Sequence, residues 1–527
     1  MYLRKTQRKN RDGRVVRYLQ IARNQRVDGT TRAEILLSFG REDALDPGVL
    51  RRLADSIHRY LGETSEATQP HSENLPQVEA ARPVGAAWLL DGLWRALGIG
   101  PALTRLLGDP GTERVVFALV ANRVLAPESP RPLDRWAAEE VVVPGLPELD
   151  GNGAALAAMD RLLEREADLR RTVREGMARA PGAPKAWAAS SRQRDLVFFD
   201  VPGTDGLPPL LVGLAVTDEG LPVGCWSWHA EDAASAPGDC LADDPGSAAA
   251  DSLRTVVVRS SRRSQLLASE PGLRPLVVTG ESLRTSPEAG ETLPHLEGRH
   301  RRVGTDLTIR DLRLGEDGRR RRVLWRSARE AEHEAVQRAA QLDFVAAELA
   351  RTTADASRRG GPDSSAQQEL LGHPLLGRWL TRCPGTGSLV VDPDAVDADA
   401  RMDGAHLLTP LTSDVGTKQA AAGYAALLRT ERAFSAMASP RYFQPVYHRL
   451  EDRGRAHVLL CWLALLLTSV AELRTARPWA SIAGELNRVR KLTFRHDGGH
   501  RHRLSRVDAA QERLFAACGV PVPSRAG

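Results

Sequence analysis

Short, unbroken runs of apolar residues in the middle of the chain constrain the fold more than any other feature. One run covers residues 196–199 and ends at Asp200, and residues 210–217, 222–229 and 274–279 continue the pattern. Runs this short, without polar alternation, are typical of strands covered on both faces. Residues before and after these runs show helical apolar spacing, and a further helix is expected over 247–269, between the last two runs. The pattern therefore predicts an α/β sheet interrupted by an inserted segment.

The rest of the chain divides by composition into further segments. A hairpin of strands at 15–22 and 31–39, joined by Asp28 and Gly29, and a helix at 46–61 make up the start. We expect the following organisation: a basic β-hairpin module with a helix at 1–62, a linker at 63–83, a helical domain at 84–185, the first part of the α/β core at 186–298, an Arg-rich, β-containing insertion at 299–402, the second part of the core at 403–480, and a basic C-terminal tail at 481–527.

Composition limits where the protein works. Of the residues, 42% are hydrophobic and 26% charged, which excludes collagen-like and disordered classes. The five cysteines form no C-x-x-C pair, as expected of a reducing compartment. No apolar segment follows the basic N-terminus, and the apolar run at 458–471 is too short to cross a bilayer, so we expect a buried helix there. These features predict a soluble, cytoplasmic protein with no membrane contact.

Positive charge is concentrated in three segments. Residues 1–41 hold eleven Lys or Arg against three acids, residues 299–329 hold eleven Arg against four acids, and residues 486–506 are basic again. Such patches are natural footprints for a polyanion, although in an Arg-rich chain they can also be solvated faces. The sequence predicts DNA contacts from the following residues: Arg4, Lys5, Arg8, Lys9, Arg319, Arg320, Arg321 and Arg322.

Two carboxylates are candidates for catalysis. Asp200 ends a buried strand, where ligands of α/β sheets gather, or where an Asp can simply cap the following turn. Glu431 shares a helix face with Tyr424 and Phe434, which requires a metal or a salt bridge, and Arg429 and Arg432 are near in sequence. If both carboxylates meet at one sheet edge, they suggest phosphoryl transfer with two Mg²⁺ or Mn²⁺ ions. Hydrolase-elbow, dinucleotide-binding and P-loop motifs are lacking, and His496, His500 and His502 have no partner cysteine for zinc.

Several sequence blocks resemble one known family. They are Leu3 to Thr6, Leu36 to Gly40, Leu119 to Arg123, Ala126 to Pro130 with Trp136, Asp403-Gly404 before Leu407 to Thr409, Tyr424 with Glu431 and Phe434, Pro445 to His448, Arg453, Arg455 to His457, and Cys461 to Ala464. Together they are similar to bacterial insertion-sequence transposases of the DDE class, in the branch with a β-rich insertion before the final Glu. The resemblance covers nearly the whole length of the chain.

The resemblance implies an RNase H-like catalytic core, built on a mixed sheet, in which Asp, Asp and Glu bind two Mg²⁺ or Mn²⁺ ions. Such an enzyme cuts element ends in double-stranded DNA at the terminal inverted repeats and joins them to target DNA, generally as a multimer, so we expect a homo-oligomer on DNA. By position, Asp200 is the first ligand and Glu431 the third. The second position is Gly280, followed by Glu281, which could substitute if a bulge re-aims it, and Asp306 is a more remote substitute.

Further departures from the family pattern surround this site. Basic residues of the family are replaced by Leu427, Ser435, Ala438 and Gln444, and the polar residues after the first Asp by residues 201–204. We therefore expect a DDE transposase with impaired chemistry. The alternatives are a catalytically inactive, transposase-derived DNA-binding protein and a metal-dependent nuclease that cuts DNA without joining it.

Overall fold

The computed structural model describes most of the chain. The described residues are 2–9, 15–27, 30–41, 77–129, 131–179, 194–201, 209–229, 240, 253–259, 277–303, 305–359, 364–385, 387–412, 414–437, 451–496 and 499–523. Internal contacts divide the chain into two units, residues 1–77 with 496–499 and residues 78–495 with 500–527. The helix expected at 46–61 lies outside the described residues.

The N-terminal module is a three-stranded antiparallel sheet in the order β1-β2-β3. Its strands are β1 (Tyr2–Lys9), β2 (Val15–Val27) and β3 (Thr30–Arg41). The predicted hairpin is confirmed, since β2 and β3 pair antiparallel from Tyr18 opposite Arg41 to Val27 opposite Thr30. Strand β1 adds a third strand that the sequence pattern did not indicate.

Six helices follow in the second unit, as the apolar spacing of residues 84–185 predicts. They are α2 (Gly85–Ala96), α3 (Ile99–Leu107), α4 (Pro110–Leu125), α5 (Leu133–Glu139), α6 (Gly153–Glu164) and α7 (Glu166–Arg179). The start of α4 shows how local sequence sets a boundary. Asp109 accepts hydrogen bonds from the amides of Gly111 and Thr112, and Pro110 occupies the first helical position.

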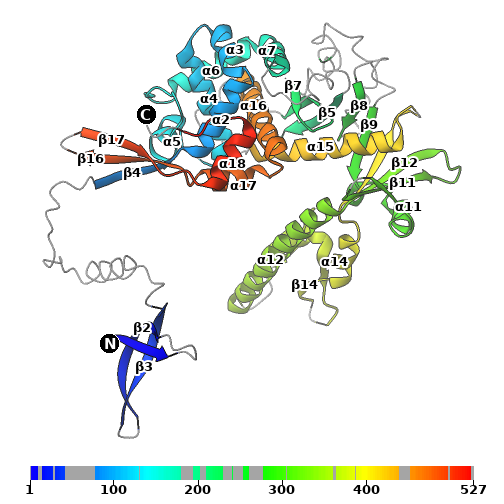
Figure 1. Ribbon diagram of the computed structural model, residues 1–527. Coiled ribbons are helices and arrows are strands. Elements are labelled where there is room, and N and C mark those ends of the chain that lie inside the picture. The colour runs from blue at the N-terminus through cyan, green and yellow to red at the C-terminus, as the bar shows by residue number, and fades with distance from the viewer. Residues whose placement is uncertain are drawn as a thin grey trace. The chain divides into compact units, whose positions relative to one another are not determined.

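A nine-stranded mixed sheet forms the centre of this unit, in the order β10-β11-β12-β15-β9-β8-β5-β6-β7 (Figure 1). The strands are β5 (Arg194–Val201), β6 (Leu210–Val216), β7 (Pro222–His229), β8 (Leu253–Val258), β9 (Val277–Ser282), β10 (Arg301–Val303), β11 (Leu307–Leu314), β12 (Arg320–Ser327) and β15 (Ala405–Pro410). Strand β8 pairs parallel with both β5 and β9, and the other neighbours are antiparallel. The predicted α/β class with a mixed sheet is confirmed.

Two long helices cover one face of the sheet, α15 (Thr417–Met437) and α16 (Glu451–Thr475). Helix α15 lies across β5 and β8 (Figure 1). The ring of Phe434 packs edge-on against Phe199, with the centroids 5.5 Å apart. In α16 every residue of the predicted apolar run 458–471 is buried except Ser469. This burial confirms the expected buried helix. A helix that is apolar all round must be enclosed by protein on every side.

One predicted element is wrong, and its error bears on the site. The expected helix at 247–269 contains strand β8 instead, within the part that the structure describes. Its last three residues, Val256, Val257 and Val258, are β-branched and fully or almost fully buried. Stiff β-branched side chains favour a pleated strand over a helix, and here the neighbouring strands cover both edges.

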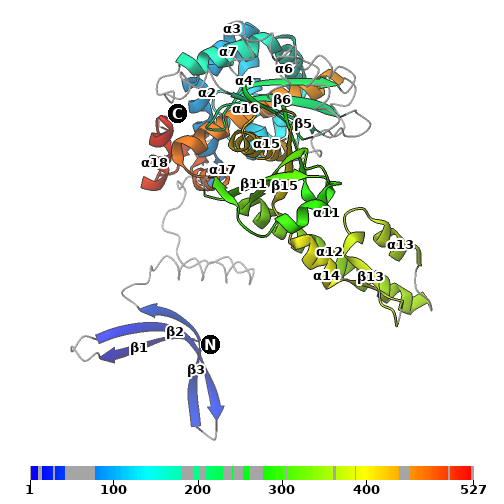
Figure 2. The same ribbon diagram turned by 90° about the vertical axis from the view of Figure 1, so that its right-hand side faces the viewer.

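The predicted insertion contributes strands to the main sheet and a helical extension. Strand β12 pairs with β15, so β10, β11 and β12 continue the same sheet. The extension contains α12 (Ala328–Arg359), α13 (Ser364–Gly372), η5 (Gly377–Trp379), β13 (Leu380–Arg382), β14 (Leu389–Val391) and α14 (Pro393–Ala400), seen together in Figure 2. These elements share a small apolar cluster of their own around Trp379. Short helical turns precede the insertion at η3 (Leu283–Thr285), α11 (Ala289–Thr292) and η4 (Leu293–His295).

The predicted linker and C-terminal tail both contribute ordered elements. A second three-stranded sheet has the order β17-β16-β4 and contains β4 (Gln77–Pro83), β16 (Arg490–His496) and β17 (Gly499–Leu504). The helices near this sheet in sequence are α17 (Trp479–Leu486) and α18 (Ala509–Cys518). Strand β4 thus begins inside the segment 63–83, and α18 starts with a capping box formed by Asp508 and Gln511.

Candidate active site

Asp200 lies at the carboxyl end of β5, as the sequence predicts, and its side chain is exposed. The residues on either side of it, Phe199 and Val201, belong to the core cluster under α15, whereas Leu196 and Phe198 belong to the cluster on the other face of the sheet. Because side chains alternate along a strand, Asp200 leaves β5 on the Phe198 face at the point where the strand ends.

Glu431 lies on α15, three residues before the Phe434 ring that contacts Phe199. Its side chain is 18% exposed and forms an ion pair with Arg259. A salt bridge was one of the two expectations for this glutamate, but the partner is not Arg429 or Arg432. Arg432 pairs with Glu330 instead.

Arg259, the residue that the sequence analysis missed, follows the last residue of β8. Its backbone amide donates to the carbonyl of Phe198 at 3.4 Å, which holds it beside the end of β5. Although burial alone would lower the pKa of the guanidinium, the Glu431 carboxylate raises the pKa of Arg259 above its ordinary value. The Arg259 cation is therefore paired with Glu431 at the end of β8, beside the end of β5 that carries Asp200.

Gly280 lies in β9, opposite Leu408 of β15, and the strand passes directly beneath the ring of Tyr424. A Cβ atom at this position would lie 2.6 Å from Cζ of Tyr424 and closer still to two other ring atoms. Glycine is required here by close approach, and no side chain fits unless the ring moves. Since Gly280 faces α15, strand alternation directs Glu281 to the opposite face.

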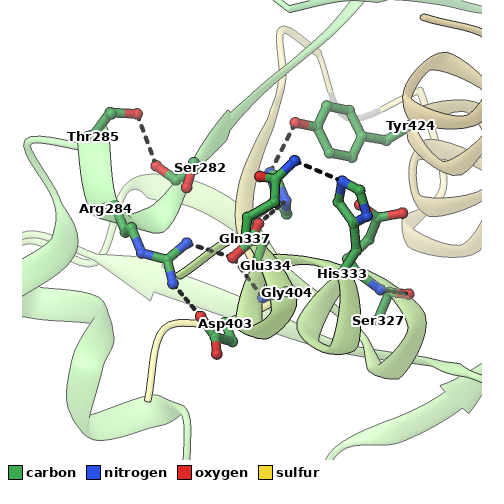
Figure 3. A network of polar contacts seen from close by, with 12 residues as sticks. Ser282, Arg284, Thr285, Ser327, His333, Glu334, Gln337, Asp403, Gly404 and Tyr424 are labelled. Atoms are coloured by element: carbon green, nitrogen blue, oxygen red, sulfur yellow. Dashed lines mark hydrogen bonds and ion pairs between the residues drawn. The ribbon is translucent and has the colours of Figure 1, made fainter. Parts of the chain in front are cut away.

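Tyr424 is held in place by a polar network that Figure 3 shows from close by. Its hydroxyl and Nδ1 of His406 are 3.0 Å apart. Burial raises the pKa of the Tyr424 hydroxyl and lowers the pKa of His406 to about 4, so this hydrogen bond joins a protonated tyrosine and a neutral imidazole. The Trp325 ring packs edge-on against both, with centroids 5.5 Å from Tyr424 and 5.3 Å from His406.

The N-terminal segment matches one family model. Residues 3–70 match the family model described as IS1634 family transposase, N-terminal domain. The chain carries an IS1634 family transposase N-terminal domain. No curated protein and no solved structure matches the chain. The resemblance to insertion-sequence transposases is confirmed for this segment.

Within the segment that matches the IS1634 family model, β1 carries the cations predicted to contact DNA. Arg4 is half-buried and Lys5 is exposed, opposite Gln20 and Leu19 of β2. Arg8 and Lys9 lie on the same strand opposite Val16 and Val15. These assignments remain predictions, because neither the fold nor the IS1634 match tests a contact with DNA.

The second predicted cluster, Arg319 to Arg322, lies outside the segment that matches the IS1634 model and is engaged within the protein. Arg322 forms a two-pronged ion pair with Glu288 at 2.6 and 2.8 Å. Arg320 pairs with Glu288 at 2.6 Å and with Glu291 at 2.7 Å. Arg321 donates to the Val415 carbonyl at 3.1 Å, and Arg319, 86% exposed, lies 3.5 Å from Asp317.

The residues present do not fit the two-ion centre that the transposase resemblance implies. Among the described residues, no group of three or more His, Cys, Asp or Glu side chains is placed to hold a metal ion. The charge of Glu431 is compensated by Arg259, Gly280 offers no ligand atom, and Asp306 lies in the turn between β10 and β11, the two strands farthest from β5 on that side of the sheet. Mg²⁺ is bound by carboxylate oxygens whose negative charge is not already balanced by a neighbouring cation.

Proposed function

We propose that the chain is an insertion-sequence transposase of the DDE class that binds double-stranded DNA and whose cleavage and strand transfer are impaired. The observation that carries the proposal is the match of residues 3–70 to the IS1634 family transposase N-terminal domain. Proteins of this kind act on the ends of their own element, so the substrates we expect are terminal inverted repeats and target DNA. Such chemistry takes place in the cytoplasm on chromosomal or plasmid DNA.

The N-terminal module is our candidate for the DNA-binding surface. Residues 1–41 carry a net charge of +8, from eleven Lys or Arg and three acids, and β1 carries Arg4 and Lys5 on its two faces. A protein that neutralises phosphates releases condensed counterions, and this release drives binding at low salt. Arg320, Arg321 and Arg322 are less suited to this role, because binding phosphate would break their contacts with Glu288, Glu291 and the Val415 carbonyl.

An RNase H-like catalytic core is the architecture we propose for the nine-stranded sheet. The mixed sheet supports it, with Asp200 and Glu431 brought to neighbouring elements, β5 and α15, at one end of the sheet. Impairment is supported by the Arg259–Glu431 ion pair, since a guanidinium holds a carboxylate that the family uses as a ligand. The same ion pair favours the second candidate, a transposase-derived DNA-binding protein with no catalysis.

The test measures DNA binding and DNA cutting on the same full-length protein. The probe is a duplex carrying the DNA that flanks the coding sequence, where terminal repeats would lie, in buffers with Mg²⁺ or Mn²⁺. We expect retarded complexes whose affinity falls steeply with salt, with no cut ends. Replacing Arg4 and Lys5 by alanine should lower the slope of log K against log[salt] by about 1 per lost phosphate contact. Arg171→Ala on α7, an exposed cation, is the matched control.

The outcomes separate the parts of the proposal. Absence of salt-dependent binding would contradict the DNA-binding role, and cutting by the wild type that Glu431→Gln abolishes would contradict impairment. Cut ends that are never joined to target DNA would point to a nuclease instead. Mass photometry with and without DNA tests the proposed homo-oligomer on paired ends.

A further inference from the structure

The end of β8 lies beside the end of β5, next to Asp200. Strands β5 and β8 are parallel, with Val258 beside Phe198, and the amide of Arg259 extends this pairing by one bond. Carboxyl ends of parallel strands meet at the same edge of a sheet, where ligands bind. Residue 259 is therefore one residue from the register of Asp200, on the adjacent strand.

The side chain at position 259 is directed toward α15. Val257 belongs to the core cluster beneath α15, and alternation along the strand gives residue 259 the same face. The ion pair with Glu431 agrees with this direction. Glu330 and Tyr424 are the other titratable groups that interact with Arg259, and His406 is influenced by the same cation.

Position 280 also faces α15, but it is less suited to hold a ligand than position 259. Strand β9 is separated from β5 by β8, so Gly280 is one strand farther from Asp200 than residue 259. The Tyr424 ring fills the space that a side chain at 280 would need, and Glu281 is directed to the face away from α15. The sequence placed the second ligand at 280 because β8 was expected to be helix.

We propose that position 259 is the second ligand position of an ancestral metal site, and that the Arg259 guanidinium now compensates Glu431 in place of a divalent cation. The inference rests on the proposed function and refines it. With an acidic residue at 259, that residue and Glu431 would give two carboxylates on the α15 face, at the end of the sheet where Asp200 leaves β5 on the other face. With arginine there, one of the two remaining carboxylates is neutralised and the site repels a cation.

The test restores the acid in the full-length protein and measures metal binding without DNA. Free Mn²⁺ is titrated by electron paramagnetic resonance in Arg259→Asp, Gly280→Asp and wild type. We expect Arg259→Asp to bind one Mn²⁺ or more at least about tenfold more tightly than wild type, or about 1.4 kcal/mol. Adding Glu431→Gln to Arg259→Asp should remove the gain, and Gly280→Asp should show none.

A second variant keeps the test decisive if Arg259→Asp folds poorly, which circular dichroism and thermal melting will reveal. Arg259→Asn removes the cation without adding a ligand, so its Mn²⁺ affinity should exceed that of wild type and depend on Glu431. Tight Mn²⁺ binding by wild type that Glu431→Gln abolishes, or a gain in Gly280→Asp but in neither variant at 259, would overturn the inference. Failure of DNA binding in the mobility-shift assay would contradict the proposed function and leave the Mn²⁺ result standing.

Discussion

Replacing Gly280 by alanine should destabilise the sheet where β9 passes beneath Tyr424. The added methyl would lie 2.6 Å from Cζ and closer to two other atoms of a fully buried ring. Ordinary van der Waals contact begins near 3.4 Å, so the ring or the strand must move by roughly 1 Å. Trp325 and His406 block the retreat of the ring at centroid distances of 5.5 and 5.4 Å.

The expected cost is worked from two terms. Overpacking a tight core costs about 1–3 kcal/mol. Loss of the 3.0 Å hydrogen bond between Tyr424 and His406 adds about 1 kcal/mol. A total of about 3 kcal/mol corresponds to a roughly hundredfold larger population of the open state of β9 and α15, and so to hydrogen exchange about a hundredfold faster. Hydrogen exchange followed by mass spectrometry on peptides covering 277–282 and 417–437 measures this opening directly.

Two further variants make the comparison sharp. Gly484→Ala in α17 adds a methyl in open space and should be neutral or stabilise by up to about 1 kcal/mol. Once Tyr424→Ala has emptied the ring's volume, Gly280→Ala should cost less than about 0.5 kcal/mol more. Exchange in β9 that stays within threefold of wild type in Gly280→Ala would refute the reasoning, and additive costs in the double variant would show that the ring is not the obstacle.

Three other predictions follow from buried charges. Burial lowers the pKa of His406 to about 4, against an ordinary value of 6.5, so the unfolded chain takes up the proton first as the pH falls. The free energy of unfolding should therefore fall by about 3 kcal/mol between pH 6.5 and a pH below 4. Urea titrations at several pH values should show a flatter pH profile for His406→Gln than for wild type. Arg284→Ala removes the cation that contacts Glu334, Asp399 and Asp403, and should cost about 3 kcal/mol and speed proteolysis within α12, whereas unchanged cleavage would contradict its role. Arg322→Ala should lower stability by about 1–3 kcal/mol in urea titrations but leave DNA affinity unchanged, because Glu288 already occupies this guanidinium; weaker DNA binding would return the cluster to the DNA surface.

The spacing of apolar residues predicted the strands and helices whose burial leaves a periodic pattern in the sequence. The run at 196–199 ending at Asp200 is strand β5, and the helical spacing around Glu431 is α15, because burial on two faces or on one stripe leaves a periodic trace. Residues 253–258 were misread because a six-residue strand within a longer amphipathic stretch carries little periodic signal. The three consecutive valines were the signal available.

The site itself depends on contacts that no local pattern contains. Arg259 and Glu431 are 172 residues apart in sequence, and only the packing of α15 across β8 brings them together. Likewise, the requirement for glycine at 280 comes from Tyr424 on a distant helix. The basic run Arg319 to Arg322 indicated an anion-binding surface, but the acids that engage it, Glu288 and Glu291, lie on short turns before the insertion.

The position of β15 between β9 and β12 has a consequence for synthesis on the ribosome. As the nascent chain emerges, β9 offers an open backbone edge that is closed only when Ala405–Pro410 has been translated. Residues 283–404 must therefore leave the exit tunnel before the central sheet can be completed, and α15 covers it later still. Such distant pairing slows folding and leaves the edge open to other chains, so overproduced protein should depend on chaperones that shield nascent strands.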